Sequence, residues 1–85
     1  MRYSVIPSDA GYAALQDLER QGKSIRVLLN GEPQHRCVTV DDTIGIVVRY
    51  VEGPSGLILH DHEIGEALVE TVSGAIHIEV YSRED

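Results

Sequence analysis

Aromatic and sulfur-containing side chains are scarce in this chain. Its 85 residues include no Phe or Trp, four Tyr, one Met and one Cys. The core must therefore come from Val, Ile, Leu and Ala, with Tyr as the one aromatic contribution. The single cysteine, Cys37, excludes an internal disulfide, which is typical of proteins from a reducing, cytosolic compartment.

Long apolar runs are also missing. No stretch approaches the roughly 20 apolar residues that cross a bilayer, and the N-terminal MRYSVIPSDAG lacks the apolar segment of a secretion signal. We therefore expect one domain over residues 1–85, without membrane contact and in the cytoplasm. For a domain of this size the expected net stability is about 5 kcal/mol.

Basic residues are rare in the second half of the chain. Residues 1–40 carry five basic and four acidic side chains, whereas residues 41–85 carry two basic and ten acidic ones, a net charge of −8. Direct binding of nucleic acid needs Lys and Arg at the phosphates, so this balance argues against it. An acidic half keeps a small protein soluble or forms an acidic docking face.

Residues 45–59 give the strongest fold signal. The run IVVRYV at 46–51 is apolar on both faces, which predicts a central strand covered on both sides. The sequence GPSG at 53–56 predicts a tight turn. Residues 57–59 are then expected to return as a short partner strand.

The chain before this stretch predicts an extended segment, one helix and two strands. We expect a helix over residues 10–21, capped by Ser8 or Asp9 and ended by Gly22. Apolar residues recur at every second position over residues 24–30, which predicts a strand, and the following Asn30-Gly31 predicts a hairpin turn. The next strand is expected to start near residue 34 and to run to residue 40.

Two further strands complete the predicted fold, over residues 67–72 and 75–81, with Ser73-Gly74 as the hairpin turn between them. The predicted class is α+β: one N-terminal helix, then about six short antiparallel strands in a twisted meander sheet or a small barrel. Residues 1–23 form the extended segment and the helix, and residues 24–81 the meander.

A group of histidines suggests metal chemistry. His60 and His62 point the same way in an extended segment, which would let two imidazoles share a metal. His35 and Cys37 have the same spacing. If the strands that carry them were adjacent, the four side chains would form a tetrahedral zinc site. The spacing matches no standard zinc signature.

Evidence for catalysis is weaker. A Cys37–His35 nucleophile pair lacks an orienting third group. Glu63, Glu66, Glu70 and Glu79 fall on predicted loops and outward faces, where carboxylates are simply hydrated. Phosphate-binding glycine loops and a serine elbow motif are missing from the sequence. We therefore expect a protein that is not an enzyme.

Short motifs within residues 24–81 resemble small, uncharacterised proteins encoded by tailed bacteriophages and prophages. The matching pieces are a strand and turn (Arg26, Val27, Leu28, Asn30, Gly31), an acidic turn (Asp41, Asp42), an R-Y-V strand (Arg49, Tyr50, Val51) and a closing strand (Gly74, Ile76, Ile78). The resemblance implies a phage or prophage origin, hence a place in the host bacterial cytoplasm or the virion. It implies no activity and no site residues.

Three functional hypotheses follow. The first is a non-enzymatic binding or assembly protein of phage or prophage origin, which contacts a protein partner or a second copy through a sheet face or an edge strand. The second is an acidic inhibitor that mimics nucleic acid toward a host factor. The third is a metal-binding module or small metalloenzyme that uses His60 and His62.

Overall fold

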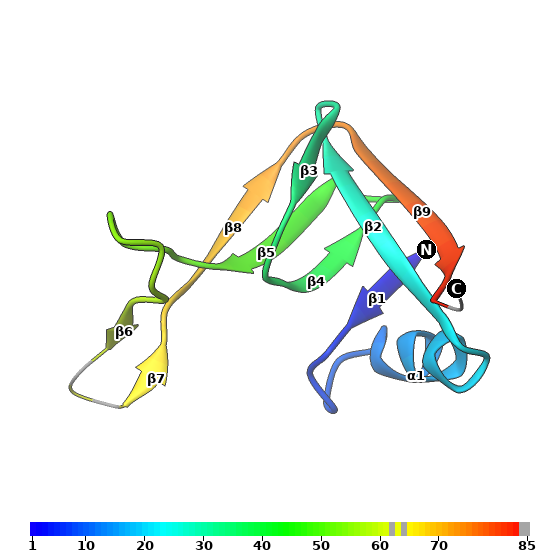
Figure 1. Cartoon of the computed structure of the whole chain (residues 1–85), viewed down its shortest axis with the longest axis horizontal. Coiled ribbons are helices and arrows are strands. Elements are labelled where there is room, and N and C mark those ends of the chain that lie inside the picture. The colour runs from blue at the N-terminus through cyan, green and yellow to red at the C-terminus, as the bar shows by residue number, and fades with distance from the viewer. Residues whose placement is uncertain (62, 64, 84–85) are drawn as a thin grey trace.

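The computed structural model of this protein describes residues 1–61, 63 and 65–83. One helix and nine strands lie in this part of the chain (Figure 1). In order they are β1 (Arg2–Ser4), α1 (Tyr12–Arg20), β2 (Lys23–Leu29), β3 (Glu32–Gln34), β4 (Cys37–Asp41), β5 (Ile46–Tyr50), β6 (His60–Asp61), β7 (Glu66–Ala67), β8 (Val69–Ser73) and β9 (Ile76–Ser82). The predicted class, α+β with an N-terminal helix, is confirmed.

The strands form separate antiparallel sheets. A four-stranded sheet has the order β1-β4-β5-β8, a three-stranded sheet has the order β3-β2-β9, and β6 pairs with β7. Over the described residues none of these sheets closes, so the structure is the open alternative and not the barrel. The central strand that the β-branched run predicted is β5, which lies between β4 and β8.

Helix α1 connects β1 of the four-stranded sheet to β2 of the three-stranded sheet, and the chain passes back to the four-stranded sheet after β3. The turn at Asn30 and Gly31 is confirmed, with φ of 51° and 85°. The single strand predicted from residue 34 to residue 40 is wrong, however, because Arg36 has a φ of 58°. That left-handed residue cannot continue a strand, and it redirects the chain from β3 into β4.

The chain passes to the three-stranded sheet again at Gly74, where a hairpin was predicted. That prediction is wrong: β8 pairs with β5, whereas β9 pairs with β2. Backbone contacts at this corner explain the difference, because the Gly74 N–H donates to the Gly45 carbonyl (3.0 Å) and the Asn30 N–H to the Ala75 carbonyl (2.8 Å). A Cβ on Gly74 would lie 2.8 Å from Asn30 Oδ1. The glycine is therefore required for close approach and not for a hairpin.

Helix α1 begins two residues later than predicted and packs on β1 and β2. The predicted cap by Ser8 or Asp9 is wrong: Asp9 Oδ1 accepts a hydrogen bond from the Gly11 N–H (2.8 Å) in a turn before the helix, and the N-cap residue is Gly11, without a side-chain capping bond. A Cβ there would lie 2.9 Å from the backbone of Arg2 and Tyr3. The predicted end is confirmed, with Gly22 at a φ of 73°.

The core is small. Among the described residues five apolar side chains are buried, and Val47 on the central strand is fully inaccessible. Ser4 and Thr39 are buried beside them and share a hydrogen bond of 2.8 Å between their hydroxyl groups. The buried apolar residues are Tyr3, Val27, Val38, Val40 and Val47.

Candidate protein-interaction surface

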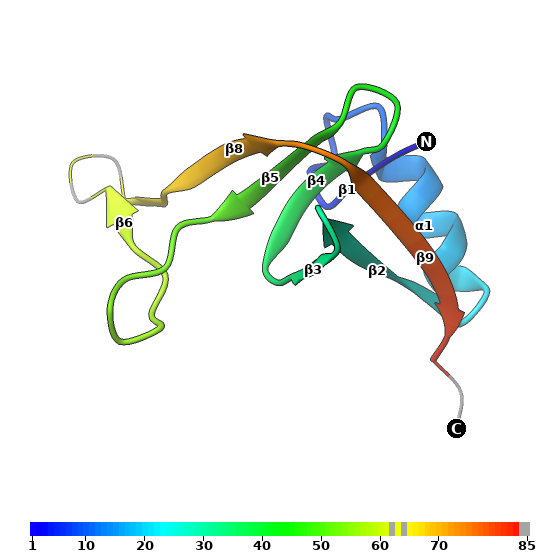
Figure 2. The same cartoon turned by 90° about the horizontal axis from the view of Figure 1, so that it is seen from above.

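A projecting arm leaves the four-stranded sheet between β5 and β8 (Figures 1 and 2). We define it as residues 51–61, 63 and 65–68. Residues 57–59 were expected to return as a short partner strand after the turn at 53–56, and they do return antiparallel beside residues 51–53, where the Gly53 N–H donates to the Leu57 carbonyl (2.8 Å). Strand β5 itself is paired on both sides, by β4 and β8, so the returning segment pairs with the residues that follow β5. That segment folds within the arm, where Ile58 forms an isolated bridge with Glu52.

Backbone hydrogen bonds fix the base of the arm. The Val51 N–H donates to the Leu68 carbonyl (3.0 Å), the Leu68 N–H to the Leu59 carbonyl (2.9 Å), and the Leu59 N–H to the Val51 carbonyl (2.9 Å). Three segments of the chain are therefore tied together in a ring of hydrogen bonds. Beyond the ring lie the predicted turn at 53–56 and the short β6–β7 pair.

The arm exposes apolar side chains. Leu57 is 70% exposed, and Leu59, Leu68 and the adjoining Val69 are 41%, 39% and 51% exposed. Single exposed apolar residues are normal on a protein surface, but a group of them on one projection is typical of an interaction site. These four residues were not predicted as a site, because the alternation rule assigns faces only within a paired strand.

The arm is also acidic. No Lys or Arg occurs between residues 50 and 82. Glu52 pairs with Arg36 at 3.1 Å, and Asp61 Oδ1 accepts a hydrogen bond from the Glu63 N–H (2.9 Å). Within the described part of the chain, Glu63 and Glu66 have no basic side chain at ion-pair distance. The arm therefore presents negative charge beside its exposed leucines.

Basic residues gather at the other end of the molecule, where α1 ends, β2 begins and β9 ends. We call this surface the basic end. Arg26 is exposed, lies over the Tyr81 ring, 5.6 Å from its centroid, and pairs with Glu79 at 3.5 Å. Arg20 pairs with Asp17, and Arg83 Nη2 donates to the Glu19 carbonyl (2.9 Å). Val80 and Tyr81 are 47% and 44% exposed, and β9 is an edge strand of its sheet. The residues of the basic end are Arg20, Lys23, Arg26, Val80, Tyr81 and Arg83.

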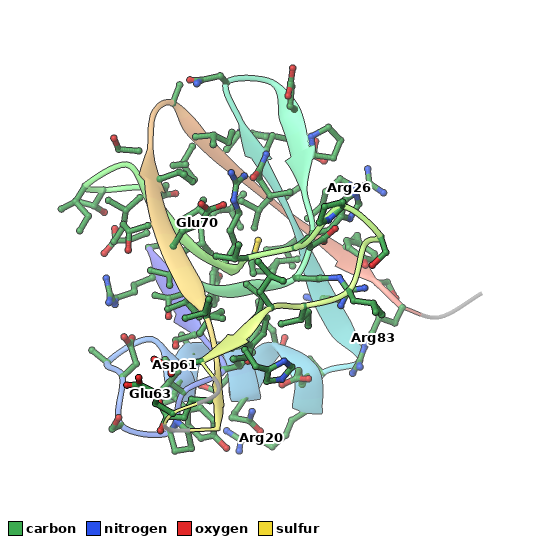
Figure 3. The ribbon with its side chains drawn as sticks, turned by 90° about the vertical axis from the view of Figure 1, so that its left-hand side faces the viewer. Arg20, Arg26, Asp61, Glu63, Glu70 and Arg83 are labelled. Atoms are coloured by element: carbon green, nitrogen blue, oxygen red, sulfur yellow. The ribbon has the colours of Figure 1, made fainter. Side chains whose placement is uncertain are left out.

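Figure 3 looks at the molecule from the side of the arm. Asp61 and Glu63 lie on the left of that view, and Arg26 and Arg83 lie on the right. Figure 1 shows the arm and the end of β9 at opposite ends of the long axis. The arm and the basic end therefore lie apart within one copy of the chain.

The residues of the predicted zinc site come from separate parts of the fold. Cys37 begins β4, His35 lies just before it, and His60 lies on β6 of the arm. His62 falls outside the described residues. In the part of the chain that is described, no three His, Cys, Asp or Glu side chains are gathered in a metal-binding group. The zinc site stays a prediction.

Cys37 lies beside a cleft of about 370 Å³ between the two larger sheets and α1, which Tyr3, Leu15 and Val27 also line. Burial raises the pKa of its thiol, although the Arg49 guanidinium acts in the opposite direction. A thiol with a raised pKa is protonated at neutral pH and is a poor nucleophile. The geometry therefore favours Cys37 as a small apolar side chain of the interior, and not as a nucleophile paired with His35.

Two carboxylates with lowered pKa values, Asp9 and Asp41, lie on the body and not on the arm. Two hydrogen bonds from the Arg2 guanidinium, each of 2.9 Å, lower the pKa of Asp9 from 3.8 to about 2. Burial of Asp41 acts to raise its pKa, but hydrogen bonds from the Thr43 and Ile44 N–H groups and from Arg2 lower it overall. These groups join β1 to the turn before α1 and to β4, which is a structural role.

Comparison with known proteins gives no match to any family model, any curated protein or any solved structure. Among the described residues no helix is long and apolar enough to cross a membrane. The fold and its surfaces therefore define the class: a small α+β domain of open antiparallel sheets with a projecting arm.

Proposed function

We propose that this chain is a small non-enzymatic binding or assembly protein of phage or prophage origin that acts through protein–protein contacts. The observation that carries the proposal is the arm, which holds its exposed leucines away from the body on a fixed base. A segment that only connected β5 to β8 would not need apolar side chains in water.

The overall dimensions support an interaction role. The accessible surface is 5716 Å², whereas a folded monomer of 9.4 kDa exposes about 5,000 Å². The radius of gyration is 13.5 Å against about 12 Å for a compact domain of this length. The excess surface, roughly 700 Å², compares with the roughly 800 Å² that each partner buries in a standard interface.

Site-specific photo-crosslinking tests the proposal. A photoreactive residue replaces Leu57 on the arm, and in a matched control it replaces Ile44, which is 63% exposed on the body. In cells of the native host we expect a discrete protein adduct from position 57 and none from position 44. Adducts from neither position, or equal labelling from both, would contradict an interaction role for the arm.

The charge of the arm favours a second candidate, the acidic inhibitor that mimics nucleic acid. Residues 51–68 carry four carboxylates and no Lys or Arg. A partner held by such charges would be a basic, nucleic-acid-binding protein, and it would dissociate as salt is raised because exposed charges are screened. A complex that survives high salt would contradict this candidate and favour contact through the leucines.

The proposed phage or prophage origin rests on the short motifs between residues 24 and 81. We expect the gene to lie among genes for virion assembly. A chromosomal position far from any phage gene, in every genome that carries a close homologue, would contradict it.

A further inference from the structure

We propose that β9 pairs with β9 of a second copy of the chain, antiparallel about a two-fold axis at Ile78. The three-stranded sheets of the two copies would then join into one continuous sheet. This inference goes beyond the proposed function, because β9 lies at the far end of the molecule from the arm (Figure 1).

The hydrogen bonds between β2 and β9 show which backbone groups of β9 face the open edge. The Asn30 N–H donates to the Ala75 carbonyl (2.8 Å) at one end of their common register. The Arg83 N–H donates to the Gly22 carbonyl (2.8 Å) at the other end. Hydrogen-bonded pairs in an antiparallel ladder recur at every second residue. The odd-numbered residues of β9 therefore bond to β2, and the even-numbered ones point their N–H and C=O groups toward the open edge.

Strand β9 lacks the features that keep an exposed edge from pairing with another chain. Protected edges are short, or they carry Pro, Lys or a bulge. Edge strands β1 and β3 have three residues each, and β3 contains Pro33. Edge strand β8 has five residues. Strand β9 pairs with β2 over seven consecutive residues and contains neither Pro nor Lys. It is the longest open edge among the described strands.

The side chains of β9 match themselves in one register. With the two-fold axis at Ile78, Ile76 lies opposite Val80 of the second copy, and His77 lies opposite Glu79 of the second copy. The outward N–H and C=O groups of the three apolar residues then meet each other across the axis. An axis at Glu79 would instead set two carboxylates directly opposite each other, which is destabilising.

The mixed charge of this face suits a contact between identical surfaces. Glu79 pairs with Arg26 at 3.5 Å and lies 3.7 Å from His77 of its own chain. Each copy thus presents both signs of charge beside the edge, so the two copies need not set like charges against each other. A two-fold contact uses the same patch on both copies. These observations select a second copy as the strand that β9 accepts.

Pairing through β9 leaves both arms free, because the arm and the end of β9 lie at opposite ends of the long axis (Figure 1). The dimer would hold two arms at its two far ends. Two linked binding modules bind a repetitive target more tightly than one module does. The dimer is therefore a bivalent form of the binding protein.

A proline at the open edge tests the pairing. The Val80 N–H faces the edge, and Pro is tolerated on an edge strand where the N–H is not used. Val80→Pro should therefore leave the single chain folded, as circular dichroism can show. It removes a hydrogen bond between the copies and places a ring in the contact, so we expect the dissociation constant of the dimer to rise at least tenfold. Sedimentation equilibrium of the purified full chain measures it.

The matched control is Val69→Pro on β8. Val69 lies between Leu68 and Val72 on the edge of the other sheet, and its side chain is 51% exposed, against 47% for Val80. The Val51 N–H donates to the Leu68 carbonyl, so by the same alternation the Val69 N–H faces the open edge of β8. This variant should form dimers as wild type does.

Disulfide trapping tests the register, and it does so even if Val80→Pro fails to fold. In a Cys37→Ser background, Ala75→Cys is mixed with Tyr81→Cys under mild oxidation. The axis at Ile78 sets these two positions directly opposite each other, at about 4.5 Å between Cα atoms, which a disulfide can bridge. A mixture of His77→Cys with Tyr81→Cys is the control, because these positions are opposite only if the axis lies at Glu79.

The outcomes separate this inference from the proposed function. Loss of the dimer in Val80→Pro but not in Val69→Pro, with a disulfide from positions 75 and 81, supports the pairing of β9. A wild type that stays monomeric up to millimolar concentration would overturn it. So would an equal loss in both proline variants, a dimer that persists in Val80→Pro, or a disulfide from positions 77 and 81 in place of the expected one. The crosslink from position 57 tests the arm separately.

Discussion

The four-stranded sheet and the arm that leaves it are built from similar residues, but they bury them to opposite extents. In the sheet, Val40 and Val47 are 2% and 0% exposed, and the hydroxyl groups of Ser4 and Thr39 pair with each other away from water. In the arm, Leu57 and Leu59 remain 70% and 41% exposed. The comparison indicates that the body supplies folding stability, whereas the apolar groups of the arm are available for binding.

The largest expected difference between the two regions comes from truncating an apolar side chain in each. Val47→Ala leaves a cavity between β4 and β8 and should lower the free energy of unfolding by roughly 3 kcal/mol. Leu57→Ala removes a side chain that is already in water and should change it by less than about 0.5 kcal/mol. Urea titration at concentrations that keep the chain monomeric gives both values. Equal losses would show that the arm is part of the core.

Glycine substitutions sharpen the comparison at the level of the backbone. Gly45 on the body has a φ of 71°, and a Cβ there would lie 2.8 Å from the Gly74 carbonyl oxygen. Gly56 on the arm has a φ of 80° with open space around it. Gly45→Ala should therefore cost about 2 kcal/mol, from strain and clash together, and Gly56→Ala about 1 kcal/mol, from strain alone. Thermal or urea unfolding should rank them in that order.

Acid should destabilise the body through Asp9. The pKa of this carboxyl is about 2 in the folded chain and 3.8 otherwise, so its stabilising effect is complete above pH 3.8 and is lost as the pH falls toward 2. Asp9→Asn should lower the urea midpoint at pH 5 and make its decline between pH 4 and pH 2 shallower. The control is Asp17→Asn on the exposed face of α1, and a wild-type slope in Asp9→Asn would contradict the role of Arg2.

Local patterns predicted the body well. The β-branched run predicted the central strand, Asn30-Gly31 predicted the turn between β2 and β3, and Gly22 predicted the end of the helix. Each of these features depends on neighbouring residues alone. The true partners of β8 and β9, which are β5 and β2, were not predicted. Contacts between residues distant in sequence, at Gly45 and Asn30, place these two strands in different sheets. The turn at 53–56 and the return of residues 57–59 were predicted from local patterns, but the projection of this hairpin from the sheet was not, because it depends on β4 and β8 flanking β5.

The smallest expected effect is a change in melting temperature when zinc is added. Measuring it tests whether the body and the arm contribute ligands to one metal site. The Ile58 carbonyl accepts a hydrogen bond from His60 Nδ1 at 3.1 Å, a geometry that leaves Nε2 as the nitrogen for a metal. His60 lies on the arm, whereas Cys37 lies at the cleft between the sheets of the body. We therefore expect any rise in melting temperature on adding zinc to be small, to disappear in His60→Ala/His62→Ala, and to persist in His35→Ala and Cys37→Ser. Native mass spectra with and without zinc give the stoichiometry. A bound zinc that is lost in Cys37→Ser would mean that arm and body converge on one tetrahedral site, and the separation between the two regions would then be wrong.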